Sequence, residues 1–231
     1  MNDMRYVIGL VILLITFTVV AQENEKPTQP DLPGELLLDF GLNVLSENPA
    51  NLPAHVIGSN SFGIYYNHRI RFNDHISFHL SPGFTFDKYS FNSSYTWYDS
   101  AAAGIDLHQF KSFLEKNKLV TNYIELPVEF RFHPLGTVNG EGWFIGLGAV
   151  AGWRFNTHTK IKYVENERNI KDKLFDDFDL EQFRYGYQIR FGFKTFHLFY
   201  KSYLNNMFKS APDASGVNPS AFTVGMSFSG F

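Results

Sequence analysis

Residues 183–191 read Phe-Arg-Tyr-Gly-Tyr-Gln-Ile-Arg-Phe, with an aromatic or aliphatic side chain at every odd position and arginine, glycine or glutamine at every even one. Because successive side chains of a β-strand point to opposite faces, this stretch predicts a strand with one apolar and one polar face. The apolar face is bulky throughout, as a lipid-facing surface can be, whereas a closed core must mix large and small residues. Glycine on a water-facing strand would only weaken it, so glycine beside charge favours a narrow, enclosed interior.

The same period of two recurs in eight segments of about ten residues, the length that a tilted strand needs to cross the hydrocarbon layer of a bilayer. These segments are 36–44, 61–72, 76–87, 121–132, 143–154, 183–191, 196–204 and 222–229.

The connections between the segments alternate in length. The short ones follow the second, fourth and sixth segments, at 73–74, 133–141 and 192–194. The long ones follow the first, third, fifth and seventh, at 46–59, 90–118, 156–180 and 207–219. Outer-membrane barrels have an even number of strands, short periplasmic turns and long extracellular loops. We therefore expect an all-β fold: an eight-stranded antiparallel up-and-down transmembrane β-barrel in the outer membrane, with both termini in the periplasm and the long loops outside the cell.

The composition of the chain argues against several other classes of protein. A soluble lipocalin-like barrel or β-sandwich also alternates, with its apolar side chains inward, and is the structural alternative. Aromatic residues make up 17% of the 231 residues, yet the mean hydropathy is only −0.18, as expected when aromatic and polar positions interleave. The net charge of −3 argues against a nucleic-acid partner. The lack of cysteine excludes a disulfide framework and thiolate metal sites.

The N-terminus has the features of an export leader. Residues 7–20 form an apolar run that ends in Val-Val-Ala, and this run is shorter than the roughly 20 residues of a membrane-spanning helix. We therefore expect a cleavable signal peptide at 1–21, with a transmembrane anchor as the alternative. Residues 22–34 are rich in proline and charge and predict a disordered periplasmic tail, which leaves 35–231 for the barrel.

Charged residues of both signs lie on the polar face of the predicted strands. The interior of an eight-stranded barrel is just wide enough for side chains to fill, and an unpaired charge buried there would cost several kcal/mol. We therefore expect these residues to form a structural charge network in the lumen. Its predicted members are Glu35, Asp39, Arg69, Arg71, Asp87, Glu125, Glu129, Arg131, Arg154, Arg184, Arg190 and Lys201.

No pattern in the chain points to catalysis, a metal ion or a cofactor, so we expect no catalytic, metal-binding or cofactor-binding residue and no enzyme activity. The candidate metal ligands fall on different segments without the spacing of a metal site: His79, His133, His158 and His197. A barrel enzyme that modifies lipid A is the alternative that would use His158 with Ser90, Ser93, Ser94 or Asp99.

The two longest loops carry further hypotheses. In 90–118, apolar residues at near-helical spacing predict a short amphipathic helix: Ile105, Leu107, Phe110, Phe113 and Leu114. The aromatic residues Tyr95, Trp97 and Tyr98 could either bind a partner or cap the lumen. The mixed charges of 160–177 predict a solvated strand extension and loop tip, and contact with lipopolysaccharide or divalent ions is the alternative.

Several stretches, taken in order, resemble the PorT-like outer-membrane β-barrel family of the Bacteroidota. They are Pro33-Gly34-Glu35-Leu36 running to Asp39-Phe40-Gly41, the decapeptide from Tyr123 to Phe132, Gly146-Leu147-Gly148 and the closing strand to Phe231. The resemblance implies an outer-membrane location. It also implies a relationship to PorT, which is associated with protein secretion, but it does not fix a molecular role.

We therefore expect a structural, adhesive or accessory role in the cell envelope, linked to secretion if the PorT resemblance extends to function. A narrow channel for small solutes is the alternative. The expected partners are outer-membrane lipid and lipopolysaccharide, the barrel-assembly machinery during insertion, and an envelope or secretion partner. We expect a monomer that binds no nucleic acid.

Overall fold

The computed structural model describes residues 34–100, 104–109, 114–137, 141–165 and 168–230. The predicted signal peptide at 1–21, the predicted tail up to residue 33, and Phe231 lie outside these ranges, so the predictions for them are untested. Among the described residues, no helix is long and apolar enough to cross a membrane.

The described part of the chain consists of β-strands and one short 3-10 helix. The strands are β1 (Gly34–Leu45), β2 (Asn60–Arg71), β3 (Ile76–Leu80), β4 (Gly83–Ser90), β5 (Tyr95–Ser100), β6 (Gly104–Gln109), β7 (Lys116–Thr137), β8 (Glu141–Glu165), β9 (Arg168–Phe175), β10 (Phe183–Phe193), β11 (Phe196–Tyr203) and β12 (Ala221–Ser229), and the helix is η1 (Val56–Gly58). Strand β1 therefore begins at Gly34, inside the predicted tail.

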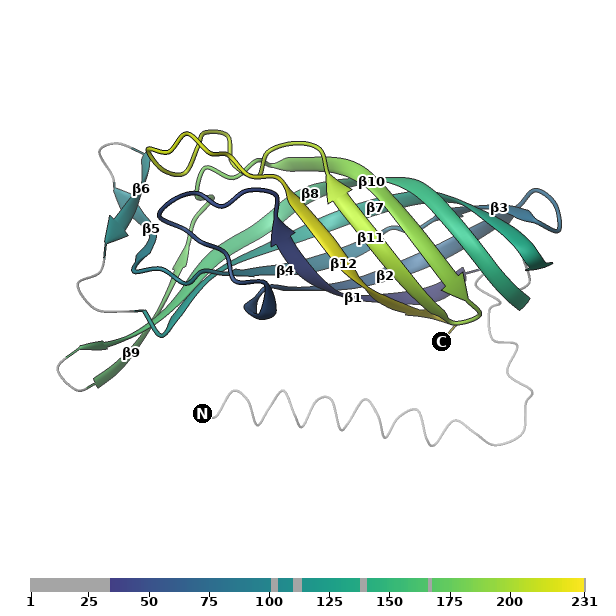
Figure 1. Ribbon diagram of the computed structural model, residues 1–231, viewed down its shortest axis with the longest axis horizontal. Helices are drawn as coiled ribbons and strands as arrows, with labels where there is room; N and C mark the ends of the chain where they lie inside the picture. The colour runs from purple at the N-terminus through teal and green to yellow at the C-terminus, as the bar shows by residue number, and fades with distance from the viewer. Residues whose placement is uncertain (1–33, 101–103, 110–113, 138–140, 166–167, 231) are drawn as a thin grey trace, which may run out of the picture. The chain divides into compact units, whose positions relative to one another are not determined.

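Ten of the strands form one antiparallel sheet that closes into a barrel (Figure 1). The order is β3-β7-β4-β2-β1-β12-β11-β10-β8-β9, and an additional pairing of β7 with β8 completes the ring and leaves β9 outside it. Strands β3 and β4 both pair with β2 and with β7, so they share one place in the wall. Because β9 lies outside the ring and β3 and β4 occupy one position together, the ring has eight strand positions. The predicted antiparallel barrel is confirmed.

Side chains alternate between the two faces of the wall. Along β10 every apolar residue is exposed and every glycine or polar residue is buried. The same holds elsewhere: Leu147, Phe130 and Ile124 are exposed, whereas Glu129 and Glu125 are buried. A lipocalin-like barrel would place its apolar face inside, so this alternative is excluded, and the apolar face is the surface available to lipid.

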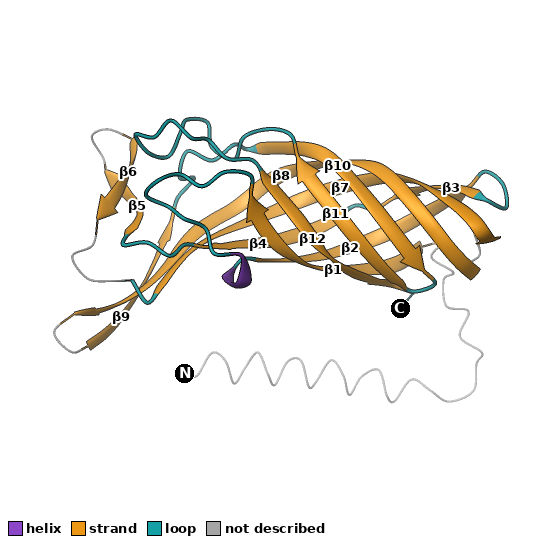
Figure 2. Cartoon of the chain, viewed as in Figure 1, coloured by secondary structure: helices purple, strands orange, loops and turns teal. Residues whose placement is uncertain are grey.

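The short connections lie at one end of the barrel, called the turn end here, and the long ones at the other, called the loop end (Figure 2). Strands β7 and β8 continue past the ring at the loop end, where β9 pairs with β8 alone. The charged segment 160–177 is thus largely a strand extension, as predicted. In contrast, the predicted turn at 133–141 was too long, because pairing continues to Thr137 and Glu141.

The amphipathic helix predicted within 90–118 is wrong for the described residues. Strands β5 and β6 instead form a two-stranded antiparallel hairpin, with Trp97 opposite Leu107. Cross-strand hydrogen bonds therefore satisfy the backbone groups of this loop. The spacing of its apolar residues fits a short helix as well as a short strand. Phe110 and Phe113 lie outside the described residues.

Candidate functional site

The lumen collects most of the charged residues that the sequence assigns to it. Those that are buried are Asp39, Asp87, Glu125, Glu129, Arg131, Arg154, Arg184, Arg190 and Lys201. Glu35 and Arg69 lie at the turn end, partly exposed and 3.9 Å apart. Arg71 is not in the lumen. It is exposed and pairs with Asp74, because it is the last residue of β2, next to the turn that leads into β3.

Glu125 is the centre of the half of the network nearer the loop end. Its Oε2 accepts hydrogen bonds from Tyr65 (2.8 Å), Thr85 (2.7 Å) and Lys201 (3.0 Å). Its Oε1 accepts one from the Tyr203 hydroxyl at 2.6 Å. The donors come from β2, β4 and β11, so this one carboxylate, on β7, joins strands from opposite sides of the ring.

Arg184 links Glu125 to a second carboxylate. Its Nη2 lies 2.5 Å from Glu125, and its Nη1 donates to Asp87 at 2.5 Å. The rings of Tyr123 and Tyr203 flank the guanidinium at 3.5 and 4.1 Å from their centroids. Cation–π contact in a desolvated site adds to the two ion pairs, so two carboxylates and two aromatic rings hold the guanidinium of Arg184 in place, although its Nε has no hydrogen-bond partner among the described residues.

Arg190 organises the half nearer the turn end. Its two terminal nitrogens reach the two oxygens of Asp39 at 3.2 and 3.3 Å, the bidentate geometry that suits arginine. Its Nε donates to Glu129 at 3.3 Å, and the other oxygen of Glu129 accepts from Arg131 at 2.5 Å. A Cβ at Gly146 would lie 2.5 Å from this oxygen, which explains why glycine lies beside Glu129 on the neighbouring strand β8.

Arg154 is the exception to charge pairing. It donates to the backbone carbonyls of Leu180 (2.9 Å) and Glu181 (3.2 Å) and to the Thr157 hydroxyl (2.8 Å). Carbonyl oxygens can satisfy a buried guanidinium when they converge on it. Arg154 therefore attaches the connection between β9 and β10 to the barrel wall.

Sequence reasoning did not identify the neutral members of the network. Tyr65, Thr85, Gln188 and Ser227 donate to or accept from the buried charges and are themselves buried. Each lies on the same strand parity as the predicted charges, so alternation was the signal that could have found them. Tyr65 in particular was obscured because Tyr66, next to it, continues the apolar face.

Two small cavities reach the network among the described residues. A cavity of about 20 Å³ reaches it beside Tyr123, Arg184 and Tyr203. A second cavity of about 40 Å³ lies at the turn end beside Glu35 and Arg131. Since a water molecule needs about 10–15 Å³ of such volume, each holds a few waters at most.

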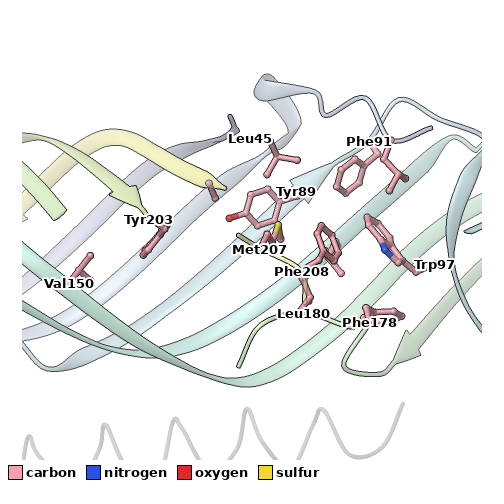
Figure 3. Packing of buried hydrophobic residues seen from close by; sticks show 13 residues of the cluster. Leu45, Tyr89, Phe91, Trp97, Val150, Phe178, Leu180, Tyr203, Met207 and Phe208 are labelled. Carbon is pink, nitrogen blue, oxygen red and sulfur yellow. The ribbon is translucent and has the colours of Figure 1, made fainter. Parts of the chain in front are cut away.

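An aromatic cluster packs at the loop end (Figure 3). Trp97, only 2% exposed, contacts Phe91 edge-on at 5.0 Å and stacks on Phe208 at 6.0 Å between ring centroids. Phe178 and Leu52 are buried in the same cluster. These residues come from the separate loop-end connections and from the β5–β6 hairpin. We call this cluster the loop-end cap, and it places Trp97 in a capping position.

Hydrogen bonds to an acidic side chain tie two of the loops to one another. The Asp213 carboxylate accepts from the backbone N–H of Asn51 at 3.0 Å and from the Ser215 hydroxyl. Partial burial alone would raise the pKa of Asp213, but these hydrogen bonds outweigh it and hold the pKa below its usual range. The carboxylate is therefore ionised at neutral pH, and this tie between two loops weakens only in acid.

The four candidate histidines do not form one cluster: His79 and His133 both line the turn-end cavity, whereas His158 lies on β8 towards the loop end. His79 contacts Ser77 and Asn67, His197 faces the carbonyl of Lys194, and His158 contacts Asn156. In the described ranges, no group of three histidine and acidic side chains could hold a metal ion. The Ser93 hydroxyl donates to the carbonyl of Asn51 at 2.5 Å, so it is engaged in loop structure.

Solved outer-membrane proteins share a distant likeness with this chain. Ail, the attachment invasion locus protein of Yersinia pestis, aligns with 86% of this chain and 100% of its own, at 11% identity and a TM-score of 0.36. The N-terminal β-barrel domain of Pseudomonas aeruginosa OprF aligns with 86% and 98%, at 13% identity and a TM-score of 0.27. A triple mutant of Rhodopseudomonas blastica porin aligns with 85% and 99%, at 9% identity and a TM-score of 0.22. At these values the likeness says nothing about activity.

Sequence comparison gives the family. A search of curated protein sequences finds no relative that matches this chain. The family model described as the outer membrane protein beta-barrel domain matches residues 40–208, which is well over half of the 231-residue chain. The match begins in β1 and runs past β11, so it covers most of the closed ring. The chain therefore belongs to the outer membrane protein β-barrel domain family and is an outer-membrane β-barrel protein.

Proposed function

We propose that this protein is a non-conducting scaffold in the outer membrane, which holds its loop-end cap and the extended β7–β8–β9 sheet outside the cell for contact with other components of the envelope. The observation that carries the proposal is the filled lumen. Glu125, Glu129, Arg184 and Arg190 are buried and mutually connected, and the loop-end cap covers the end of the barrel above them. A barrel closed in this way has its exposed chemistry on the outside.

The alternative of a narrow solute channel predicts conductance, and the proposal predicts none. The cavities of about 20 and 40 Å³ that reach the network cannot hold a continuous file of water. We expect protein inserted into a planar lipid bilayer to leave the membrane current unchanged at neutral pH. Discrete current steps that scale with the amount of folded protein would show that the lumen conducts and would contradict the scaffold.

Orientation can be tested with single cysteines, because the chain has none of its own. Lys171 lies on the loop-end extension and Asp74 in a turn at the other end, and both are exposed. In intact cells, we expect a membrane-impermeant maleimide to label K171C within minutes and D74C only after the outer membrane is permeabilised. The reverse pattern would place the loop end in the periplasm.

The proposal also covers the oligomeric state, the insertion and the activity of the protein. We infer a monomer, inserted by the barrel-assembly machinery, that acts as an adhesive or accessory component and is not an enzyme. The PorT resemblance of residues 33–41 and 123–132 supports a partner in protein secretion. Co-purification from a cross-linked envelope, with and without the β7–β8–β9 extension, tests whether such a partner binds there.

A further inference from the structure

A regular array of lysines lies on the part of the sheet that extends past the ring. Strands β7, β8 and β9 pair in register there, so residues opposite one another share a face. The lysine array consists of two cross-strand rows, Lys116, Lys162 and Lys171 in one and Lys118, Lys160 and Lys173 in the other.

This arrangement leaves positive charge uncompensated. Like charges directly opposite one another destabilise a β-sheet. Glu115 pairs with Lys162, and Asp172 accepts a hydrogen bond from the Tyr163 hydroxyl at 3.3 Å. Among the described residues that line the groove over the array, Asp172 is the one acid, while Lys88 from β4 adds a further positive charge. The groove has a volume of about 450 Å³.

The array lies on the same face of the wall as the lipid-facing surface. On β7, Lys116 and Lys118 have the parity of Ile124, which is 50% exposed on the apolar face. On β4, Lys88 follows Phe86 by two residues, which places it on the same face about 7 Å further along the strand. On β4 the apolar surface therefore passes directly into Lys88, whereas on β7 Asn122 and the buried Val120 lie between Ile124 and Lys118.

Aromatic side chains lie at the boundary between the apolar surface and the lysine array. Phe155 and Phe175 are 48% and 58% exposed, and the Lys173 ammonium lies 4.1 Å from the centroid of the Phe175 ring. Aromatic residues are enriched where a membrane protein passes from hydrocarbon to headgroups. The array thus lies at the level where phosphate groups of membrane lipids are found.

We propose that the lysine array binds the phosphate groups of phosphorylated glycolipids of the lipid A type in the leaflet around the barrel. Cross-strand neighbours are about 5 Å apart and the two rows about 7 Å apart, so one phosphate can contact two or three ammonium groups. The acyl chains of the same lipid then lie against the exposed phenylalanines below. This inference rests on the proposed outward orientation of the loop end.

A soluble sulfated or phosphorylated polysaccharide is the competing occupant. It would gain charge contacts with the array but nothing from the apolar surface beside it. A lipid gains both, because its headgroup and its chains meet the wall on one continuous face. The continuity of Phe84, Phe86 and Lys88 along β4 therefore favours the membrane lipid.

The test compares two double variants with the same loss of charge. Lys160→Gln with Lys173→Gln removes two exposed members of the array, and Lys194→Gln with Lys209→Gln removes two exposed lysines elsewhere. Each protein is titrated in neutral detergent micelles with diphosphoryl lipid A, with fully dephosphorylated lipid A and with dextran sulfate, and bound lipid is counted by native mass spectrometry. Heat-modifiable gel migration verifies that each variant is folded.

We expect the array variant to lose roughly thirtyfold in affinity for diphosphoryl lipid A, since each lysine near an anionic surface contributes about a fivefold factor. The dephosphorylated lipid should bind more weakly to all proteins and equally to both variants. Equal binding of the two lipids to the unmodified protein, or an equal loss in the control variant, would overturn the proposal. So would a preference for dextran sulfate over the lipid at the same lysines. Micelles have no sides, so these outcomes do not depend on the orientation test.

Discussion

Glu125→Gln is expected to lower the free energy of unfolding of the barrel by about 3–5 kcal/mol, the range observed when one partner of a buried ion pair is removed. The amide keeps nearly the same shape but no longer carries the charge that balances Arg184 and Lys201. Arg184 retains Asp87 at 2.5 Å, whereas the Lys201 ammonium donates its described hydrogen bonds to Tyr65 and Glu125 and lies 5.9 Å from the centroid of the Phe199 ring. The substitution thus removes the carboxylate that contacts the buried Lys201 ammonium and leaves it the more distant charge of Asp39.

The measurement is denaturant unfolding in lipid vesicles, followed by the fluorescence of the three tryptophans. Glu35→Gln is the matched control, because Glu35 is partly exposed at the turn end and 3.9 Å from Arg69, where ion pairs contribute about 0–1 kcal/mol. Lys201→Met added to Glu125→Gln should recover part of the loss, with a coupling of about 1–3 kcal/mol. Equal losses from Glu125→Gln and Glu35→Gln would show that the network does not support the wall.

The fold follows from the sequence because a membrane barrel imposes one rule on every strand. Each strand faces lipid on one side and a narrow interior on the other. Apolar and polar residues therefore alternate along whole strands, as in β10. Strand positions therefore came close to those observed. Parity predicted the buried lumen charges, but it also assigned Arg71 to the lumen, although this residue is exposed at the end of β2. Arg154 shows the limit: its partners are backbone carbonyls of Leu180 and Glu181, which no side-chain pattern encodes.

The loop end was less predictable for a related reason. Loops are not held to a two-sided environment, so the apolar positions around Trp97 fit a helix as well as the observed β5–β6 hairpin. The lysine array was hidden in the same way. Its charges are interspersed with acids along the chain, and only the register of β7, β8 and β9 places the lysines on one face and directs Asp172 towards Tyr163.

Leu147→Arg tests the physical premise of the whole architecture, that the apolar face touches lipid. Leu147 is 62% exposed on β8, with Phe130 and Ile189 as its neighbours on the adjacent strands. Trp143 and Trp153 lie on the same strand on either side of it, as aromatic residues do at the two edges of a membrane. Leu147 therefore lies near the middle of the apolar belt.

An arginine at the bilayer midplane of a barrel costs about 2–4 kcal/mol, and one near the interface about 0–1 kcal/mol. Leu204 provides the matched control, since it is also 62% exposed but follows the last residue of β11 at the loop end. We expect vesicle unfolding to show the larger loss for Leu147→Arg and almost none for Leu204→Arg. In water, an exposed leucine can become arginine at either position with little effect on stability. Two equally harmless substitutions would therefore mean that the apolar face is not covered by acyl chains, whereas a larger loss at Leu147 shows that it lies deeper in the membrane than Leu204.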